Sequence, residues 1–197
     1  MESDRSAEAS SGPVLQVPPE ERKTLLLVAR KAIEDFLQEG ESPPWRTDSP
    51  VLLQPRATFV TLWCRKEDDL RGCRGEPFAR RPLIESVTQM AVASATDDPR
   101  FPAVRIEEVP GLRIEISALT PIAPIRPEEI EVGRHGLLIV RGRHAGLLLP
   151  EVPARHGWSR EAFLNGICEK AGLRSGAWNV AGVELYGFET EEWSEAV

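Results

Sequence analysis

Apolar residues recur every three or four positions in three stretches of the chain, at residues 18–40, 82–97 and 159–172. This spacing places the apolar side chains on one face, so each stretch is predicted to be an amphipathic helix. The boundaries agree with this prediction, because prolines open the first two stretches and Ser159 can cap the third. Gly40 and Gly172 stand where the first and third helices are expected to end.

Strand patterns lie between the predicted helices. Residues 111–119 alternate apolar and polar side chains, which is typical of a strand with one buried face. Residues 57–64 are β-branched and aromatic and predict a central strand, with residues 70–73 as the strand that returns beside it. Three further strands are predicted at residues 136–140, 145–149 and 183–188, the first two joined as a hairpin. Helices mixed with antiparallel-type strands give an α+β fold.

The domain organisation follows from the ends of these patterns. Residues 1–17 carry no periodic pattern and are predicted to be a disordered tail. Residues 18–193 form one domain, and residues 194–197 are an acidic tail. Residues 41–55 contain four prolines and are predicted to be a loop.

Composition narrows the function classes. The net charge of −7 disfavours a broad surface for nucleic acid or an anionic membrane. Three cysteines without a CxxC pair, and three histidines, predict neither a disulfide framework nor a metal site, and no cofactor is expected. No apolar run approaches the roughly 18 residues of a membrane span, and no signal peptide is visible, so a cytoplasmic location is expected.

Cys73 is the first candidate for chemistry, because it lies between Arg71 and Arg74 in the run Leu-Arg-Gly-Cys-Arg-Gly. Fixed positive charge beside a thiol is expected to lower its pKa. Arg71 and Arg74 are also candidates to bind a substrate anion. The alternatives are that Cys73 is a small buried apolar side chain and that Arg71 pairs with Asp68 or Asp69.

Four polar residues are further candidates for a substrate site. Asp98 and Arg100 lie in a proline-rich loop, although an Asp–Arg pair that only packs this loop explains them equally well. Glu115 and Ser117 share the polar face of the strand at 111–119, where they would serve in binding or acid–base work if that face lines a cleft.

His135 is the candidate base for Cys73, because its pKa suits proton transfer and a nucleophilic cysteine needs a base within hydrogen-bond reach. The remaining cysteines, Cys64 and Cys168, lie in apolar patterns and are expected in the core, although Cys64 facing Cys73 across a hairpin would form a redox pair.

Several phrases in order resemble the AMMECR-type domain family over roughly residues 22–193. They are LRGCRG (70–75), DPRFPAV (98–104), IEISALTP (114–121), GRHGLLI (133–139), GLLLPEV (146–152) and CEKAGL (168–173). The resemblance implies an AMMECR-type fold with a mainly antiparallel sheet, flanking helices, a larger and a smaller lobe, and a cleft near the LRGC segment. Two positions depart from the usual pattern: Arg74 replaces an aliphatic residue, and Glu151 and Pro153 replace residues of a PQVA-like phrase. Arg74 is therefore expected to face a cleft or solvent, or to have a carboxylate partner.

Prokaryotic members of this family are named protein A of the AmmeMemoRadiSam system, after an association with a Memo-type protein and a radical SAM enzyme. The resemblance therefore implies a component of a linked modification pathway that binds a small anionic or peptidic substrate, with Cys73 as a thiol participant. The alternative is a non-catalytic binding or scaffold module. A third hypothesis, nucleic-acid binding, rests on a local cluster of arginines around residues 65–81 that is interleaved with acids.

Overall fold

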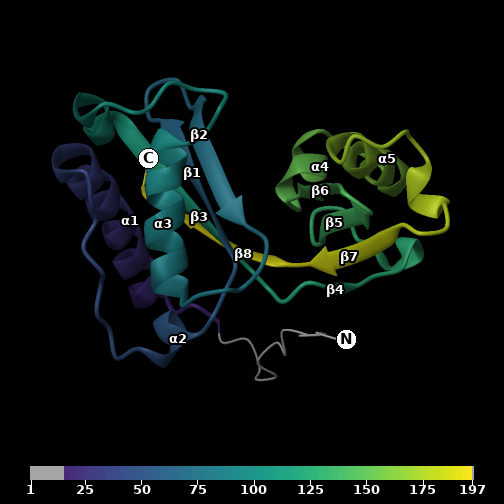
Figure 1. Cartoon of the computed structure of the whole chain (residues 1–197), viewed down its shortest axis with the longest axis horizontal. Helices are drawn as coiled ribbons and strands as arrows, with labels where there is room; N and C mark the ends of the chain where they lie inside the picture. The colour runs from purple at the N-terminus through teal and green to yellow at the C-terminus, as the bar shows by residue number, and fades with distance from the viewer. Residues whose placement is uncertain (1–15, 197) are drawn as a thin grey trace, which may run out of the picture.

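The alternating segment at 112–119 becomes the third strand of the first of two sheets. In the computed structural model, which describes residues 16–196, both sheets are antiparallel and four-stranded. The first sheet has the order β2-β1-β3-β8, with β1 at Thr58–Cys64, β2 at Leu70–Glu76, β3 at Leu112–Leu119 and β8 at Thr190–Ser194. The sheets belong to a larger and a smaller lobe that lie side by side (Figure 1).

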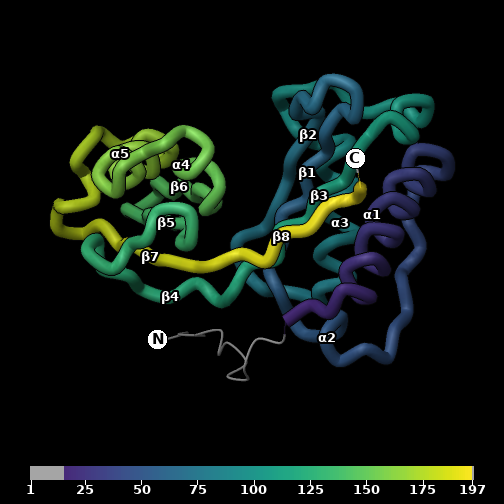
Figure 2. The backbone as a smooth tube through the Cα atoms, turned by 180° about the vertical axis from the view of Figure 1, so that it is seen from behind, coloured from purple at the N-terminus to yellow at the C-terminus, as the bar shows by residue number. Residues whose placement is uncertain are grey.

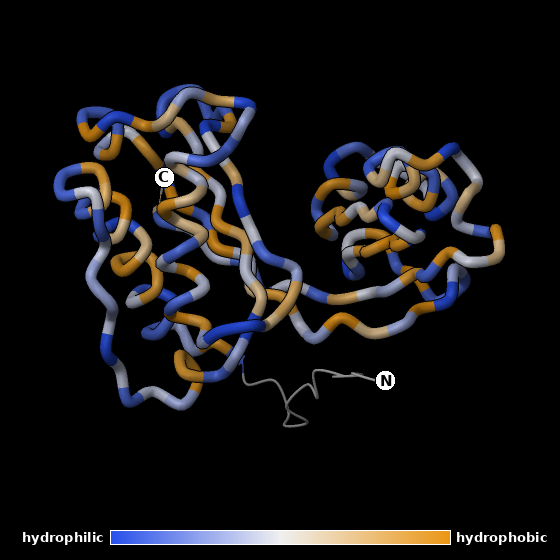
Figure 3. The backbone as a smooth tube through the Cα atoms, viewed as in Figure 1, coloured by the Kyte–Doolittle hydropathy of each residue, from blue (hydrophilic) through white to orange (hydrophobic). Residues whose placement is uncertain are grey.

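Two helices cover one face of the first sheet. They are α1 (Pro19–Glu39) and α3 (Leu83–Thr96), and the short α2 (Pro50–Leu53) lies near their ends (Figure 1). Their apolar stripes pack on the even-numbered side chains of β1 and β3, so that Val60, Leu62, Ile114 and Ile116 are fully buried. Colouring by hydropathy shows apolar positions alternating with polar ones along both helices (Figure 3). Burial of this apolar surface is the main stabilising term of the larger lobe.

The smaller lobe repeats this arrangement with one main helix. Its sheet has the order β4-β7-β5-β6, with β4 at Ala123–Pro124, β5 at Gly136–Arg141, β6 at His144–Leu148 and β7 at Glu184–Phe188. Helix α5 (Arg160–Lys170) packs its buried side chains, Phe163 among them, on β5 and β6. The short helix α4 (Glu151–Arg155) follows β6.

Two connections join the lobes on the same side. The chain leaves the larger lobe after β3, builds the smaller lobe, and returns as β8 beside β3, with Ile116 opposite Trp193 (Figure 2). The connections bond to each other, because Thr120 N donates to Glu189 O at 2.8 Å and Glu189 N donates to Thr120 Oγ1 at 2.8 Å. The relative placement of the lobes therefore depends on β8 staying paired with β3.

Two glutamates fasten β8 to the larger lobe. Glu191 pairs with Arg56 at 2.7 Å and with Arg22 at 2.9 Å. Glu195, one residue beyond β8, pairs with Arg30 at 2.5 Å and with Arg65 at 2.9 Å. It also accepts the backbone N–H of Ile114 at 3.1 Å. Charge-assisted bonds of this kind, partly shielded from water, are stronger than exposed ion pairs.

The α+β fold and the two-lobed arrangement predicted from the sequence are confirmed. Several short elements were not predicted, among them α2 in the proline-rich loop, β4 after β3, α4 after Pro150 and β8 in a stretch rich in acids. Glu195, expected in an acidic tail, is held by arginines. Of the tail expected at residues 1–17, residues 1–15 lie outside the described residues, and Val17 is buried. None of the helices in residues 16–196 is long and apolar enough to cross a membrane.

Replacing Glu195 with alanine tests how much the β8 fastening contributes. Glu195→Ala leaves Arg30, Arg65 and the Ile114 N–H without their carboxylate, so we expect the free energy of unfolding to fall by about 2–4 kcal/mol. Urea denaturation measures this change. Glu169→Ala on the exposed surface of α5 is the matched control and is expected to change stability by less than about 0.5 kcal/mol. Equal stabilities of the two variants would contradict the proposed role of Glu195.

Candidate functional site

Cys73 lies on the face of the first sheet opposite α1 and α3. It belongs to the edge strand β2 and stands opposite Thr61 of β1. Thr61 Oγ1 donates a hydrogen bond to Cys73 Sγ at 3.3 Å. The flanking Gly72 faces α3 so closely that an added Cβ would collide with the Ser94 backbone oxygen. Gly72 therefore lets β2 lie against α3 and fixes the position of the thiol.

A row of polar side chains crosses this face of the sheet. Thr61 stands opposite Cys73 on one side and opposite Glu115 of β3 on the other. Directly opposed side chains on antiparallel strands lie about 4.5–5.5 Å apart at Cβ. The next row includes Ser117 opposite Glu192 of β8, with Ser117 Oγ and Glu192 Oε2 3.5 Å apart. Glu115 and Ser117, predicted on a polar face, are 8% and 3% exposed, so this face is covered as well.

Helix α4 of the smaller lobe meets this face. The guanidinium of Arg155 lies over the Trp63 ring of β1, 5.3 Å from its centroid, and Arg113 of β3 lies 5.5 Å from the same centroid. Glu151 begins α4 and lies near enough to Glu115 and Glu192 for their charges to act on it. The polar rows, with Arg113, Trp63, Glu151 and Arg155, are called the interlobe face below.

Two carboxyl groups of the interlobe face have raised pKa values. Burial raises the pKa of Glu151 to about 7, and the charges of Glu192 and Glu115 act in the same direction while Arg155 opposes them. Burial also raises the pKa of Glu115, and Glu192 adds to this effect. A carboxyl group that titrates near neutrality, as Glu151 does, is suited to exchange protons.

The pKa of Cys73 is raised, which corrects the expectation of a stabilised thiolate. Burial is the largest cause, and the carboxylates of Asp98 and Glu151 add to it. The hydrogen bond from Thr61 and the charge of Arg100 lower the pKa but do not offset burial. Cys73 is therefore mainly a protonated thiol at neutral pH, and a nucleophilic role requires a base.

The arginines beside Cys73 in the sequence do not lie beside its thiol. Arg71 Nε pairs with Glu108 at 3.0 Å, and its Nη1 donates to the Pro102 carbonyl at 3.0 Å. The carboxylate partner of Arg71 is thus Glu108 and not the adjacent Asp68 or Asp69. The side chain of Arg74 is exposed, one of the placements expected for it.

Asp98 and Arg100 hold the loop after α3 against β2. Asp98 is 4% exposed and accepts two side-chain hydrogen bonds from Arg100, at 2.9 and 2.6 Å. Its Oδ2 also accepts the Cys73 backbone N–H at 2.8 Å, and these bonds hold the pKa of Asp98 well below its usual range. The carboxylate thus accepts a backbone N–H at the edge of the sheet. This arrangement matches the alternative in which the Asp98–Arg100 pair only packs the loop.

His135 lies in the smaller lobe, just before β5. Its Nδ1 accepts the Glu131 backbone N–H at 3.0 Å, and it lines a hollow of about 210 Å³ with Pro121 and Phe188. In residues 16–196 the hydrogen bonds of His135 and Cys73 go to different partners, so the structure does not join them as a dyad. Glu151 is the titrating group that acts on Cys73 from the smaller lobe.

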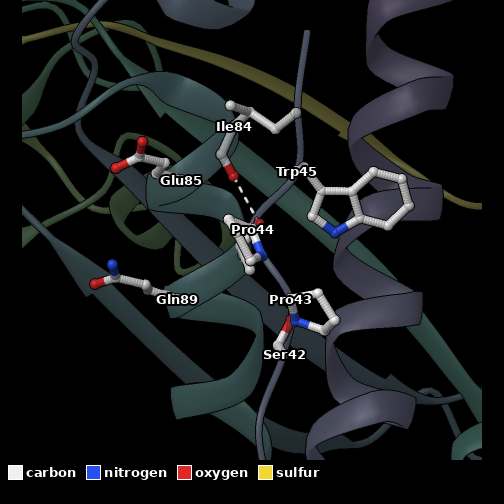
Figure 4. Close-up of a pocket in the computed structure, with 8 residues that line it drawn as sticks. Ser42, Pro43, Pro44, Trp45, Ile84, Glu85 and Gln89 are labelled. Carbon is white, nitrogen blue, oxygen red and sulfur yellow. Dashed lines mark hydrogen bonds between the residues drawn. The ribbon is translucent and has the colours of Figure 1, made fainter.

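Another hollow, of about 330 Å³, lies between α3 and the loop that follows α1. Pro44 and Trp45 from the loop and Ile84 and Gln89 from α3 are among its lining residues (Figure 4). Neither hollow is lined by the LRGC segment. In the described part of the chain, no group of three or more His, Cys, Asp or Glu residues is placed to hold a metal ion.

The cysteines do not form the redox pair considered from the sequence. Cys73 stands opposite Thr61, whereas Cys64 stands opposite Leu112, and all three cysteines are free. Cys168 is buried in the core of the smaller lobe, as expected, and Cys64 is half-buried.

Sequence reasoning missed Thr61, Trp63, Glu151 and Arg155. Thr61 carried a usable signal, because it is a polar position in an apolar strand, two residues from Phe59 and Trp63. Glu151 stood out only as a departure from the family's usual phrase, and Arg155 carried no signal, since their contacts with the larger lobe arise only when the two lobes meet.

Gly72→Ala tests the close approach of β2 to α3. The added methyl group collides with backbone and not with a flexible side chain, so we expect a loss of about 1–3 kcal/mol in the free energy of unfolding. Thermal and urea denaturation measure it. Gly111→Ala is the control, because an added Cβ there meets no atom within 4 Å. Similar losses in both variants would contradict this packing role.

Thr61→Val tests the hydrogen bond to the thiol. Removing a bond that lowers the Cys73 pKa raises this pKa further, so we expect alkylation at pH 8 to slow by about two- to tenfold. Iodoacetamide labelling with mass spectrometry of the Cys73 peptide measures the rate. Thr88→Val on α3, where the hydroxyl bonds to its own helix, is expected to leave the rate unchanged. An unchanged rate in Thr61→Val would show that this bond does not influence the thiol.

Comparison with known proteins assigns the chain to a family. The AMMECR1 family profile matches residues 26–193. A protein of Methanopyrus kandleri is 40% identical over 184 residues, which cover 89% of each chain. A protein of Pyrococcus horikoshii is 40% identical over 192 residues, covering 92% of this chain and 93% of its own length. The crystal structure of an uncharacterised Pyrococcus horikoshii protein superposes with a TM-score of 0.82 at 40% identity, covering 87% of this chain and 90% of that one. The chain therefore belongs to the AMMECR1 family.

Proposed function

We propose that this protein is a component of a modification pathway linked to a Memo-type protein and a radical SAM enzyme. In this proposal the interlobe face binds the substrate and Cys73 takes part as a thiol. The main observation that supports this site is the row Cys73–Thr61–Glu115, in which a half-buried thiol and a buried carboxyl group lie on either side of one hydroxyl group.

The thiol requires a proton acceptor, because burial raises its pKa. Glu151 is the strongest candidate, since its own pKa of about 7 lets it accept a proton at neutral pH and its charge acts on Cys73. The role expected for His135 therefore passes to Glu151 in this proposal. Transfer of the Cys73 proton to Glu151 leaves a thiolate and a neutral carboxylic acid.

The charges of the interlobe face favour a peptidic substrate with a positive group over a small anion. Three carboxyl groups, Glu115, Glu151 and Glu192, stand against two guanidinium groups, those of Arg113 and Arg155. Two candidate anion clamps already pair with acids: Arg71 with Glu108 and Arg100 with Asp98. A substrate ammonium group would offset the unbalanced negative charge.

The pathway assignment is supported by the resemblance of LRGCRG, DPRFPAV and the other phrases, in register, to prokaryotic members of the family. A non-catalytic binding or scaffold module is the second candidate, favoured by the raised pKa of the Cys73 thiol. Nucleic-acid binding has less support, because Arg65, Arg71 and Arg81 of the basic cluster pair with Glu195, Glu108 and Glu76.

Cys73→Ser separates the thiol role from the scaffold role. We expect it to lower product formation by at least about 100-fold in a mixture with the Memo-type and radical SAM proteins of the same genome, because serine is a far weaker nucleophile. Mass spectrometry of small-molecule and peptide extracts detects the product. Cys64→Ser, at a free half-buried cysteine on β1, is the matched control. Full activity of Cys73→Ser would support the scaffold, and a mixture whose output is unchanged without the wild-type chain would overturn the pathway.

A further inference from the structure

Three carboxyl groups from three elements meet where the lobes face each other. Glu115 comes from β3 and Glu192 from β8 in the larger lobe, and Glu151 comes from α4 in the smaller one. The neighbouring cations are Arg155 on α4 and Arg113 on β3. Cys73 on β2 completes the titratable groups that face Glu151. Two arginines thus face three carboxyl groups, and Arg113 divides its charge between Glu115, at 3.6 Å, and the exposed Asp68, at 2.5 Å.

Polar side chains make the contact of α4 with Trp63, whereas Leu149, just before α4, packs with Ala57, Leu119 and Phe188 in an apolar cluster beside the connections. Arg155 spans the lobes by lying over Trp63, and this ring already has Arg113 near its face. A cation–aromatic contact of this kind contributes only about 0.5–2 kcal/mol. A contact this weak leaves the position of α4 sensitive to the charge of the carboxyl groups at the same place.

The connections between the lobes would allow the smaller lobe to bend away from the interlobe face. Both connections lie on one side of the molecule, where Thr120 and Glu189 bond to each other (Figure 2). Helix α4 lies away from these connections, on the side where the lobes face each other (Figure 1). Bending at a pair of short connections changes few hydrogen bonds, which is typical of hinged domains.

We propose that the Glu115–Glu151–Glu192 cluster is a proton-controlled latch between the lobes. Protonation of Glu151 strengthens the hold of α4 on the interlobe face. Ionisation weakens this hold, so the population of open molecules with an uncovered Cys73 thiol rises, while the molecules that stay closed keep ionised Glu151 beside Cys73. The latch does not require that Cys73 react, so it stands apart from the proposed function.

The direction of the pH dependence follows from linkage. Glu151 has a pKa of about 7 when the lobes are closed and its ordinary value near 4.5 when they are open and the group is solvated. The closed state therefore binds the proton more tightly, is most favoured at low pH, and loses this advantage as the pH rises towards 7. For one proton, the ratio of closed to open molecules falls by roughly 20-fold between pH 5.5 and pH 7.5.

Energy transfer between the lobes tests the latch. One dye on α1 at the exposed Leu27 and one in the β5–β6 turn at Arg143 report the distance between the lobes, and unnatural residues carry both dyes so that the native cysteines stay. We expect the closed-to-open ratio of the wild-type chain to fall by about 20-fold from pH 5.5 to pH 7.5. Glu151→Gln should reduce this change to less than about threefold, since glutamine stays neutral.

Two further variants keep the result decisive. Glu161→Gln, at an exposed position of α5, should behave as the wild-type chain. Glu192→Gln removes a charge that raises the Glu151 pKa, so it should move the midpoint of the transition to lower pH. An unchanged lobe distance in the wild-type chain, or a full pH response in Glu151→Gln, overturns the latch.

Discussion

The pairing of β8 with β3 is the constraint on which the two-lobed structure depends. The smaller lobe has its own sheet and helix, and the return of the chain beside β3 ties it to the larger lobe. Pairing alone is a weak fastening, because β8 has five residues and lies at the edge of the sheet. The carboxylates of Glu191 and Glu195 strengthen it with four arginines drawn from α1 and the β1 region.

The smaller lobe, which β8 ties to the larger one, covers the second face of the first sheet. A sheet with helices on one face only would expose Thr61, Cys73, Glu115 and Ser117 to water, and their pKa values and reactivity would be ordinary. The approach of α4 removes part of that water and leaves carboxyl groups close together. The unusual chemistry of the interlobe face is thus a product of the lobe arrangement, and no single motif contains it.

Local patterns were sufficient to predict the main helices and most strands. The alternation at 112–119 and the apolar stripe of α1 reflect burial on one face, which nearby residues encode. Strand β8 was not predicted because Glu191 and Glu192 make its pattern polar. The arginines that pair with Glu191 and Glu195 lie more than 120 residues away in the sequence. Pairing over such distances has no local signal.

The candidate site shows the same limit. Cys73 and Glu115 were identified from residue type and alternation, and the structure places both beside Thr61. The electrostatic prediction failed because neighbours in sequence are not neighbours in space: Arg71 reaches Glu108, while Arg100 supplies the positive charge that acts on the thiol. A pKa depends on burial and on such distant partners, so the sequence of the LRGC segment alone could not predict the direction in which the pKa of Cys73 shifts.

The Asp98 bond to the Cys73 backbone also bears on self-association. Strand β2 is an edge of its sheet, and an open edge offers unpaired N–H groups to strands of other molecules. Asp98 occupies one such donor with a negative charge, and the Ser94 hydroxyl accepts the next one, from Arg74. The two donors beside the thiol are therefore already paired within the molecule, which makes this part of the edge a poor template for an added strand.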